Sequence, residues 1–368
     1  MKIYLVGGAV RDKLLGLPIK ERDWVVVGAT PEQMLALGYR QVGKEFPVFL
    51  HPQTHEEYAL ARIERKYQAG YKGFTFDTSP DVTLEADLQR RDLTINAMAE
   101  SEEGSLIDPY HGKEDLDRRV LRHVSLAFSE DPVRILRIGR FLARYAELGF
   151  HVAPETTTLM RNMVAAGEVN ALVAERVWKE LDRALGEKNP EQFFTALAEC
   201  GALPILFPDV KIEGRGMLAL QAAAQSTTSS VIRFAALLHD LPDKKYAVAA
   251  LCDRYRAPNE YRELAVLTAE YHQDAFKAAS FSAERILKLL YALDVFRREK
   301  RFKKWLAACD AIAKSQHISF DTEWLAACTQ AAKSIVVQEL IAQGLTGNDL
   351  ALRLKKMRIE KIAALVKK

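Results

Sequence analysis

The stretch IYLVGGAVRDKLLGLPIKERDWVVV, residues 3–27, decides how the fold begins. Its apolar run Ile3–Val6 predicts a buried strand, which the pair Gly7-Gly8 ends. Residues 11–15 then predict a short helix, and Trp24–Val27 predicts a second buried strand. A strand, a glycine turn, a helix and a strand in this order predict a mixed α/β unit at the start of the chain.

The glycine turn offers a place for a phosphate group. Glycine has no Cβ, so the backbone can pass close to a phosphate, and the start of a following helix adds N–H donors. Arg11 can hold a phosphate oxygen with two hydrogen bonds. Taken alone, a glycine pair after a strand is more often an ordinary turn than a phosphate-binding one. We treat Gly8 and Arg11 as candidate nucleotide-binding residues.

An acidic pair opens the second strand. Glu21 and Asp23 lie at positions i and i+2, and alternate side chains of an extended chain point to the same side. Two carboxylates placed in this way suit Mg²⁺, a hard ion that prefers oxygen ligands. A third carboxylate is expected on a neighbouring strand. Glu57 is the candidate and Glu56 the competitor, because alternation alone does not fix which of the two faces the metal.

The rest of the chain separates into an α/β part and a helical part. Further strands are predicted at Val48–Leu50, Glu57–Ala61 and Ser105–Ile107. Pro31–Ala36 predicts a short helix with Thr30 as its N-cap. From Asp131 to Leu365, apolar residues recur at helical spacing. The predicted fold class is therefore α+β, with an α/β head before an all-helical remainder.

Composition sets further limits. The 368 residues predict two to four structural units, and the net charge of +3 does not by itself indicate a nucleic-acid partner. No apolar run is long enough to predict a membrane helix, and residues 1–12 lack the apolar core of a signal peptide. The four scattered cysteines are predicted to be buried thiols in a reducing compartment: Cys200, Cys252, Cys309 and Cys328.

A third motif is RRDLTINAMA, residues 90–99. Its apolar positions predict the start of a helix with basic residues at the entrance. Arg91 can contact a phosphate. Asp92 and Asn96 lie at i and i+4, so on a helix they would face one side and contact a ribose or order the loop.

A fourth motif is EDPVRILRIGR, residues 130–140. Pro132 suits the first turn of a helix, with Asp131 as its N-cap. Arg134, Arg137 and Arg140 recur every three residues and predict a basic stripe. An exposed, solvated helix face is the alternative interpretation of that stripe.

In this order and at these spacings, GGAVRD (7–12), the acidic pair and RRDLTINAMA resemble the motifs of class II CCA-adding enzymes and their poly(A) polymerase relatives. The resemblance implies a nucleotidyltransferase-type sheet, with helices on one side, in the head. EDPVR resembles the element with which this family selects the incoming base. It implies that Asp131 and Arg134 hydrogen-bond the base edge, and that Arg137 and Arg140 hold the nucleotide.

The resemblance extends beyond the motifs. ERVWKE, residues 175–180, looks like the neck element that supports the nucleotide-binding helix. Residues 62–87, which include Glu64-Arg65-Lys66 and Gly70-Tyr71, match the length of a loop used in switching from C to A addition. One departure concerns the metal site, because many members have Asp where this chain has Glu21.

Residues 233–240, RFAALLHD, resemble the signature of HD metal-phosphohydrolases. Such a site needs further His and Asp ligands, and only His272 and Asp310 are candidates downstream of the pair His239-Asp240. We therefore expect a structural role for the pair rather than a working phosphohydrolase.

The resemblance thus implies addition of C, C and A to the 3′ end of tRNA from CTP and ATP with Mg²⁺, in the cytoplasm and with no obligate protein partner. The expected domains are a head at 1–125, a neck at 126–190, a body at 191–300 and a tail at 301–368. The basic segment 350–368 is either a solvated helix face or an RNA contact. A poly(A) polymerase, a CC-only or A-only enzyme, and a non-catalytic tRNA-binding protein are the alternatives.

Overall fold

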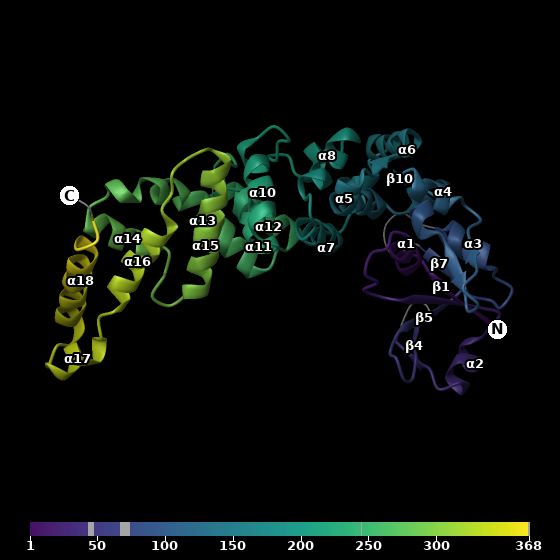
Figure 1. Cartoon of the computed structure of the whole chain (residues 1–368), viewed down its shortest axis with the longest axis horizontal. Coiled ribbons are helices and arrows are strands. Elements are labelled where there is room, and N and C mark those ends of the chain that lie inside the picture. Colours follow the sequence, from purple (N-terminus) through teal and green to yellow (C-terminus); the bar gives the residue numbers. More distant parts are fainter. Residues whose placement is uncertain (43–47, 67–73, 244, 367–368) are drawn as a thin grey trace. The chain divides into compact units, whose positions relative to one another are not determined.

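The structure is a computed structural model that describes residues 1–42, 48–66, 74–243 and 245–366. The chain forms two compact units (Figure 1). The first comprises Met1–Glu180 and Gln192–Leu206, and the second comprises Leu181–Glu191 and Phe207–Lys368. The predicted division into head, neck, body and tail is finer than this one and stays a prediction.

A seven-stranded sheet organises the first unit, in the order β3-β4-β5-β2-β1-β8-β9. Strands β2 and β5 run parallel, and the other neighbours run antiparallel. Its strands are β1 (Lys2–Val6), β2 (Asp23–Val27), β3 (Arg40–Gln41), β4 (Val48–Leu50), β5 (Glu57–Leu60), β8 (Ala99–Ser101) and β9 (Leu106–Ile107). Two small pairs accompany the sheet: β6 (Ile63–Lys66) with β7 (Phe74–Asp77), and β10 (Val120–Leu121) with β11 (His151–Val152).

Apolar side chains cover both faces of this sheet. Val25 packs in a cluster with Leu88 of α3 (Leu84–Gln89), whereas its neighbour Val26 packs with Met34 of α2 (Pro31–Ala36). Successive residues of a strand face opposite sides, so α2 and α3 lie on opposite faces. The expectation of helices on one side only is wrong, because the apolar run Val25–Val27 has no polar face to leave in water.

Most local predictions in the head are confirmed. All five predicted strands are present to within a residue or two at their ends. Thr30 caps α2 with its side chain, in a reciprocal capping box with Gln33. The helix after the glycine turn, α1 (Gly8–Leu14), begins three residues earlier than predicted.

The predicted helix at residues 90–99 is wrong. This segment follows α3, forms a single 3-10 turn at Thr94–Asn96 and then enters β8. Leu93 forms a β-bridge with His123, and Ala99 pairs with Val6 of β1. Local apolar spacing favoured a helix, but pairing with distant strands satisfies these backbone groups instead.

The remainder of the first unit is helical and carries the EDPVR motif on α5. Its helices are α4 (Gly112–Asp117), α5 (Val133–Tyr145), α6 (Pro154–Ala165), the first part of α7 (Ala174–Leu185), α8 (Glu191–Glu199) and α9 (Leu203–Leu206). Helix α5 begins at Val133 with Pro132 as its N-cap, so the predicted cap Asp131 lies one residue before the cap position. The carboxylate of Asp131 still accepts a hydrogen bond from the Val133 amide at 3.2 Å.

The second unit is built from helices, as predicted. They are α10 (Arg215–Ser226), α11 (Ser230–Leu237), α12 (Lys245–Tyr255), α13 (Asn259–Lys277), α14 (Ala283–Ala292), α15 (Glu299–Ser315), α16 (Thr322–Lys333), α17 (Val337–Ala342) and α18 (Gly347–Ala363). No helix in the described part of the chain is long and apolar enough to cross a membrane.

The four cysteines are free and buried, as predicted. Burial raises the pKa of the Cys252 thiol to about 12 and that of the Cys328 thiol to about 11. Burial also raises the pKa of Cys200 and Cys309.

Candidate active site

Two guanidinium groups flank the Gly7-Gly8 turn. Gly7 has a positive φ of 70°, and a Cβ at this position would lie 2.7 Å from Nη1 of Arg91. A Cβ on Gly8 would lie 3.3 Å from Nη2 of Arg11. Only glycine combines this backbone conformation with so close an approach of Arg91. The turn is therefore built against positive charge, as a phosphate-binding turn requires.

The acidic pair lies next to this turn. Asp23 is the register partner of Val6, the residue before Gly7, and on its other side it pairs with Glu57 of the parallel strand β5. Paired residues share a face of the sheet, so Glu57 lies beside Asp23. Glu56 instead accepts hydrogen bonds from Nε1 of Trp24 at 2.9 Å and from Arg22 at 3.3 Å. Of the two candidates, Glu57 is the one placed to join the pair.

Burial raises the pKa of Asp23 above its ordinary value of 3.8. The positive charge of Arg91 opposes this rise, and the negative charge of Glu21 adds to it. A carboxylate held near a second negative charge is a group that a bound cation stabilises.

The donor set fits Mg²⁺ with two protein carboxylates. Within the described ranges, no three His, Cys, Asp or Glu side chains come together as a group that could hold a metal. Mg²⁺ commonly uses one or two carboxylates, with water and substrate phosphates completing its shell. Glu21 and Asp23 meet that requirement, and Glu57 as a third ligand stays a prediction.

A buried carboxylate that the sequence analysis did not single out positions Arg91. Asp87 is fully buried and forms ion pairs with Arg90 at 2.7 Å and with Arg91 at 3.3 Å. Burial opposes ionisation of Asp87, but the two arginines outweigh it and lower its pKa. Spacing at i and i+4 from Asp87 to Arg91 is the signal that could have identified it.

Arg11, Asn96, Asp92 and Arg137 form a continuous chain of contacts from the glycine turn to α5. Arg11 donates to the side-chain oxygen of Asn96, whose amide group donates to Asp92 at 2.9 Å. The other oxygen of Asp92 accepts from Nε of Arg137 at 2.7 Å. Burial alone would raise the pKa of Asp92, but Arg137 and Asn96 hold it well below its usual range. Asp92 and Asn96 were predicted to face one side of a helix; they lie together here, but a 3-10 turn carries them instead of an α-helix.

The carboxylate of Asp12 holds Arg11, the residue at which this chain of contacts begins, and the sequence did not indicate this role. Its carboxylate accepts from Arg11 at 2.9 Å, from Arg144 at 3.0 Å and from the Tyr145 hydroxyl at 2.9 Å. Arg11 itself is 4% exposed. The contacts give Arg11 a structural role, and its predicted grip on the triphosphate stays a prediction.

The three arginines of the predicted basic stripe on α5 do not form a solvated face. Arg134 donates to the carbonyl oxygens of Ala127 at 3.1 Å and Arg90 at 2.7 Å. Arg137 binds Asp92, as described above. Arg140 is buried and forms an ion pair at 2.6 Å with Glu180 of α7. The exposed-face interpretation is therefore wrong.

Helix α7 also holds Asp131. Arg176 donates through Nη1 to Oδ1 at 2.9 Å and through Nη2 to Oδ2 at 2.7 Å. Arg176 pairs with Asp131, and Glu180 pairs with Arg140. These two ion pairs give a physical basis to the predicted supporting role of residues 175–180. The structure thus brings Gly8, Arg11, Arg91, Asp92, Asn96 and Arg137 into one contact system that includes α5. The pairing of β2 with β1 places Asp23 next to the glycine turn of this system.

The His239-Asp240 pair lies in the second unit and is arranged differently. The Nδ1 hydrogen of His239 donates to the carbonyl of Ala236 at 2.8 Å, and its Nε2 accepts from the Gln316 amide at 3.1 Å. Its ring contacts that of His272 at a centroid distance of 5.0 Å. Burial lowers the pKa of His239 to about 4. Both ring nitrogens are engaged within the protein, so neither is free to bind a metal.

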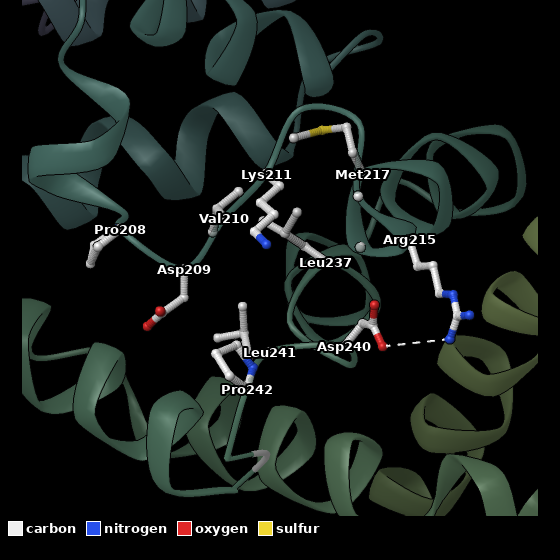
Figure 2. Close-up of a pocket in the computed structure, with 12 residues that line it drawn as sticks. Pro208, Asp209, Val210, Lys211, Arg215, Met217, Leu237, Asp240, Leu241 and Pro242 are labelled. Atoms are coloured by element: carbon white, nitrogen blue, oxygen red, sulfur yellow. Dashed lines mark ion pairs between the residues drawn. The ribbon is translucent and has the colours of Figure 1, made fainter.

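Asp240 lines a cavity of about 360 Å³, and His239 is not among the residues that line it (Figure 2). Its carboxylate forms an ion pair with Arg215 at 4.0 Å, and Lys211 and Asp209 also line the cavity. Asp310, the other proposed helper, pairs with Lys314 at 2.6 Å. The geometry does not gather His239, Asp240 and Asp310 into one site.

Comparisons with known proteins agree with this geometry. The family described as Poly A polymerase head domain matches residues 3–122, and the one described as Probable RNA and SrmB-binding site of polymerase A matches residues 149–213. The chain is 53% identical to the CCA-adding enzyme of Coxiella burnetii, over 100% of this chain and 96% of that protein. It is 50% identical to the multifunctional CCA protein of Thioalkalivibrio sulfidiphilus, over 99% of this chain and 98% of that protein.

The fold is shared with a solved structure, the Thermotoga maritima CCA-adding enzyme complexed with tRNA. The TM-score is 0.71 at 21% sequence identity, over 99% of this chain and 87% of the other. Because the sequence similarity to the curated relatives runs through the whole chain, from the glycine turn to the C-terminal helices, the chain belongs to the family of CCA-adding enzymes.

Proposed function

We propose that this protein adds C, C and A in order to the 3′ end of tRNA, using CTP and ATP and releasing pyrophosphate. The observation that carries the proposal is the contact system that joins the glycine turn to α5, with Asp23 of the acidic pair next to that turn. The full-length relatives named as CCA-adding enzymes support the same reaction.

In the proposed reaction the 3′ hydroxyl of tRNA attacks the α-phosphate of the nucleotide. Gly8 lets the triphosphate approach the backbone, and Arg91 and Arg11 face it with positive charge. Asp92 and Asn96 are placed to contact the ribose, and Arg137 and Arg140 hold α5 and the nucleotide. Asp131 and Arg134 select the base. The protein contributes chiefly positioning and charge neutralisation, which dominate catalysis of phosphoryl transfer.

Glu21 and Asp23 would hold Mg²⁺, with Glu57 beside them. When bound there, the ion supplies charge neutralisation for the attacking and leaving oxygens. Glu21 keeps the charge and the oxygen donors of the Asp found in many family members, so we expect the extra methylene to be tolerated.

The tRNA would be recognised by shape and by contacts to its backbone, since double-stranded RNA hides its base edges. In the proposed four-domain division, the tail contributes basic contacts through α18, where Arg353, Lys355, Lys356 and Lys361 are exposed. Lys367 and Lys368 of the same predicted patch, and residues 67–73 of the predicted switching loop, lie outside the described residues. Four free buried thiols fit the proposed cytoplasmic location.

The test is incorporation of labelled CTP and ATP, separately and together, into tRNA transcripts that end before CCA, after C and after CC. We expect three additions in order, followed by a stop. A long A tail would identify a poly(A) polymerase, and addition of CC alone or of A alone would identify a partial enzyme. No incorporation at all would refute the proposal and leave a tRNA-binding protein.

A further inference from the structure

Arg176 of α7 holds the carboxylate that the proposed function assigns to base selection. Two parallel hydrogen bonds, at 2.9 and 2.7 Å, join its guanidinium to the two oxygens of Asp131. The side chains are 28% and 21% exposed, so solvent screens the pair only in part. A two-point contact of this kind fixes the plane of the carboxylate as well as its position.

The hydrogen bonds of Asp131 leave one oxygen with spare capacity. Oδ1 accepts from Arg176 and from the Val133 amide, which occupies both of its acceptor positions. Oδ2 accepts from Arg176 only, among the hydrogen bonds of the described residues. One acceptor position therefore remains on Oδ2, and Arg176 determines its direction.

The pairing edges of the four bases differ at the atom that such an oxygen would meet. Cytosine and adenine carry an exocyclic amino group, a donor, where uracil and guanine carry a carbonyl oxygen, an acceptor. A carboxylate oxygen only accepts, so it suits the first two bases and opposes the second two. Discrimination between the two pairs of bases thus requires that the carboxylate of Asp131 cannot rotate and move Oδ2 away from the carbonyl oxygen of a wrong base.

Resting on the proposed function, we propose that Arg176 is a positioning residue for base selection, which directs Oδ2 of Asp131 so that CTP and ATP are accepted and UTP and GTP are rejected. Arg176 does this without touching the nucleotide. Attachment of α7 does not depend on this contact, because the ion pair of Glu180 with Arg140 and the buried Val177 lie on the same helix.

The experiment compares Arg176→Ala and Arg176→Lys with the wild-type protein on tRNA that ends before CCA and tRNA that ends after CC. The kcat and KM are measured separately for CTP, ATP, UTP and GTP. For Arg176→Ala we expect kcat/KM for CTP and ATP to fall and that for UTP and GTP to fall less or to rise. The preference over UTP and GTP should decrease by roughly ten-fold or more, as for loss of a hydrogen bond to a charged group.

Arg176→Lys keeps the charge but provides no two-point contact, so its preference should lie between those of Arg176→Ala and the wild type. The matched control is Arg183→Ala, an exposed arginine on the same helix, which should leave the four-nucleotide preference unchanged. Urea unfolding of each variant separates a change in preference from a loss of folded protein.

An equal fall for all four nucleotides, or an unchanged preference in folded Arg176→Ala, would overturn the inference. Asp131→Asn, measured in parallel, separates it from the proposed function. If Asp131→Asn loses the preference and Arg176→Ala keeps it, only the positioning role of Arg176 fails. If the wild-type protein adds no nucleotide, or if Asp131→Asn keeps the preference, the proposed function or the role of Asp131 fails first, and the inference falls with it.

Discussion

Removal of one partner from the Arg140–Glu180 ion pair should destabilise the first unit strongly. Nε of Arg140 lies 2.6 Å from Oε2 of Glu180, and the two side chains are only 10% and 7% exposed. Glu180→Ala leaves a buried guanidinium without its counter-charge, which costs about 3–5 kcal/mol in comparable sites. A domain is typically stable by about 5–15 kcal/mol, so this loss is a large fraction of the total.

The double variant Arg140→Met/Glu180→Leu should be far less harmful than either single variant. Apolar replacement of both partners removes the uncompensated charge and keeps most of the packing volume, and such exchanges are often neutral or stabilising. The interaction energy from the double-mutant cycle should therefore be several kcal/mol.

The assay is urea-induced unfolding followed by the fluorescence of Trp24 and Trp178, which belong to the first unit. All variants are compared in one background that carries Trp305→Phe and Trp324→Phe, because these two tryptophans belong to the second unit. With a slope of roughly 2 kcal/mol per molar urea, Glu180→Ala should lower the midpoint by about 1.5–2.5 M. An unchanged midpoint, or a double variant as unstable as the sum of the singles, would refute the reasoning. A stable but inactive double variant would show that Arg140 also serves the nucleotide.

Further predictions concern catalysis and tRNA binding. Asp23→Asn should abolish incorporation and leave tRNA binding by filter assay nearly intact; surviving incorporation would show that the metal site is wrongly assigned. Burial, and after it the charge of Glu21, raise the pKa of Asp23 above 3.8 when no metal is bound, so at subsaturating Mg²⁺ kcat/KM should fall as the pH drops through that raised value. The residual activity of Glu21→Gln should show this acid limb at lower pH. Arg134→Ala should blur the choice of base more than it weakens tRNA binding, and unchanged discrimination would contradict its role. Truncation after Thr346 should weaken tRNA binding and reduce the dependence of the binding constant on salt concentration. An unaltered salt dependence would mean that the basic residues of α18 face solvent and do not contact the tRNA backbone.

The sequence was most informative where a function depends on neighbours along the chain. The glycine turn and the acidic pair beside it could be predicted, because spacing within a strand or a turn places these groups. Alternation could not separate Glu56 from Glu57, but the parallel register of β2 and β5 does. That register depends on how distant strands meet.

Partners that come from distant parts of the chain were not predictable. Asp12 binds Arg144 and Tyr145, and Asp131 binds Arg176, through contacts that no local pattern encodes. The same limit explains the error at residues 90–99, where strand pairing overrides local apolar spacing. It also explains why the arginines of α5 could be interpreted as solvent-exposed when their counter-charges lie on other elements.

The burial of the four cysteines has a practical consequence for labelling. Thiolate is the reactive form of cysteine, and a buried thiol whose pKa lies near 11 or 12 supplies almost none of it at neutral pH. A single cysteine introduced on the exposed face of α18, for example at Leu352, would therefore react with a maleimide dye well before any native thiol. A fluorophore could report the arrival of tRNA at the C-terminal helices of a protein that still carries all of its own cysteines.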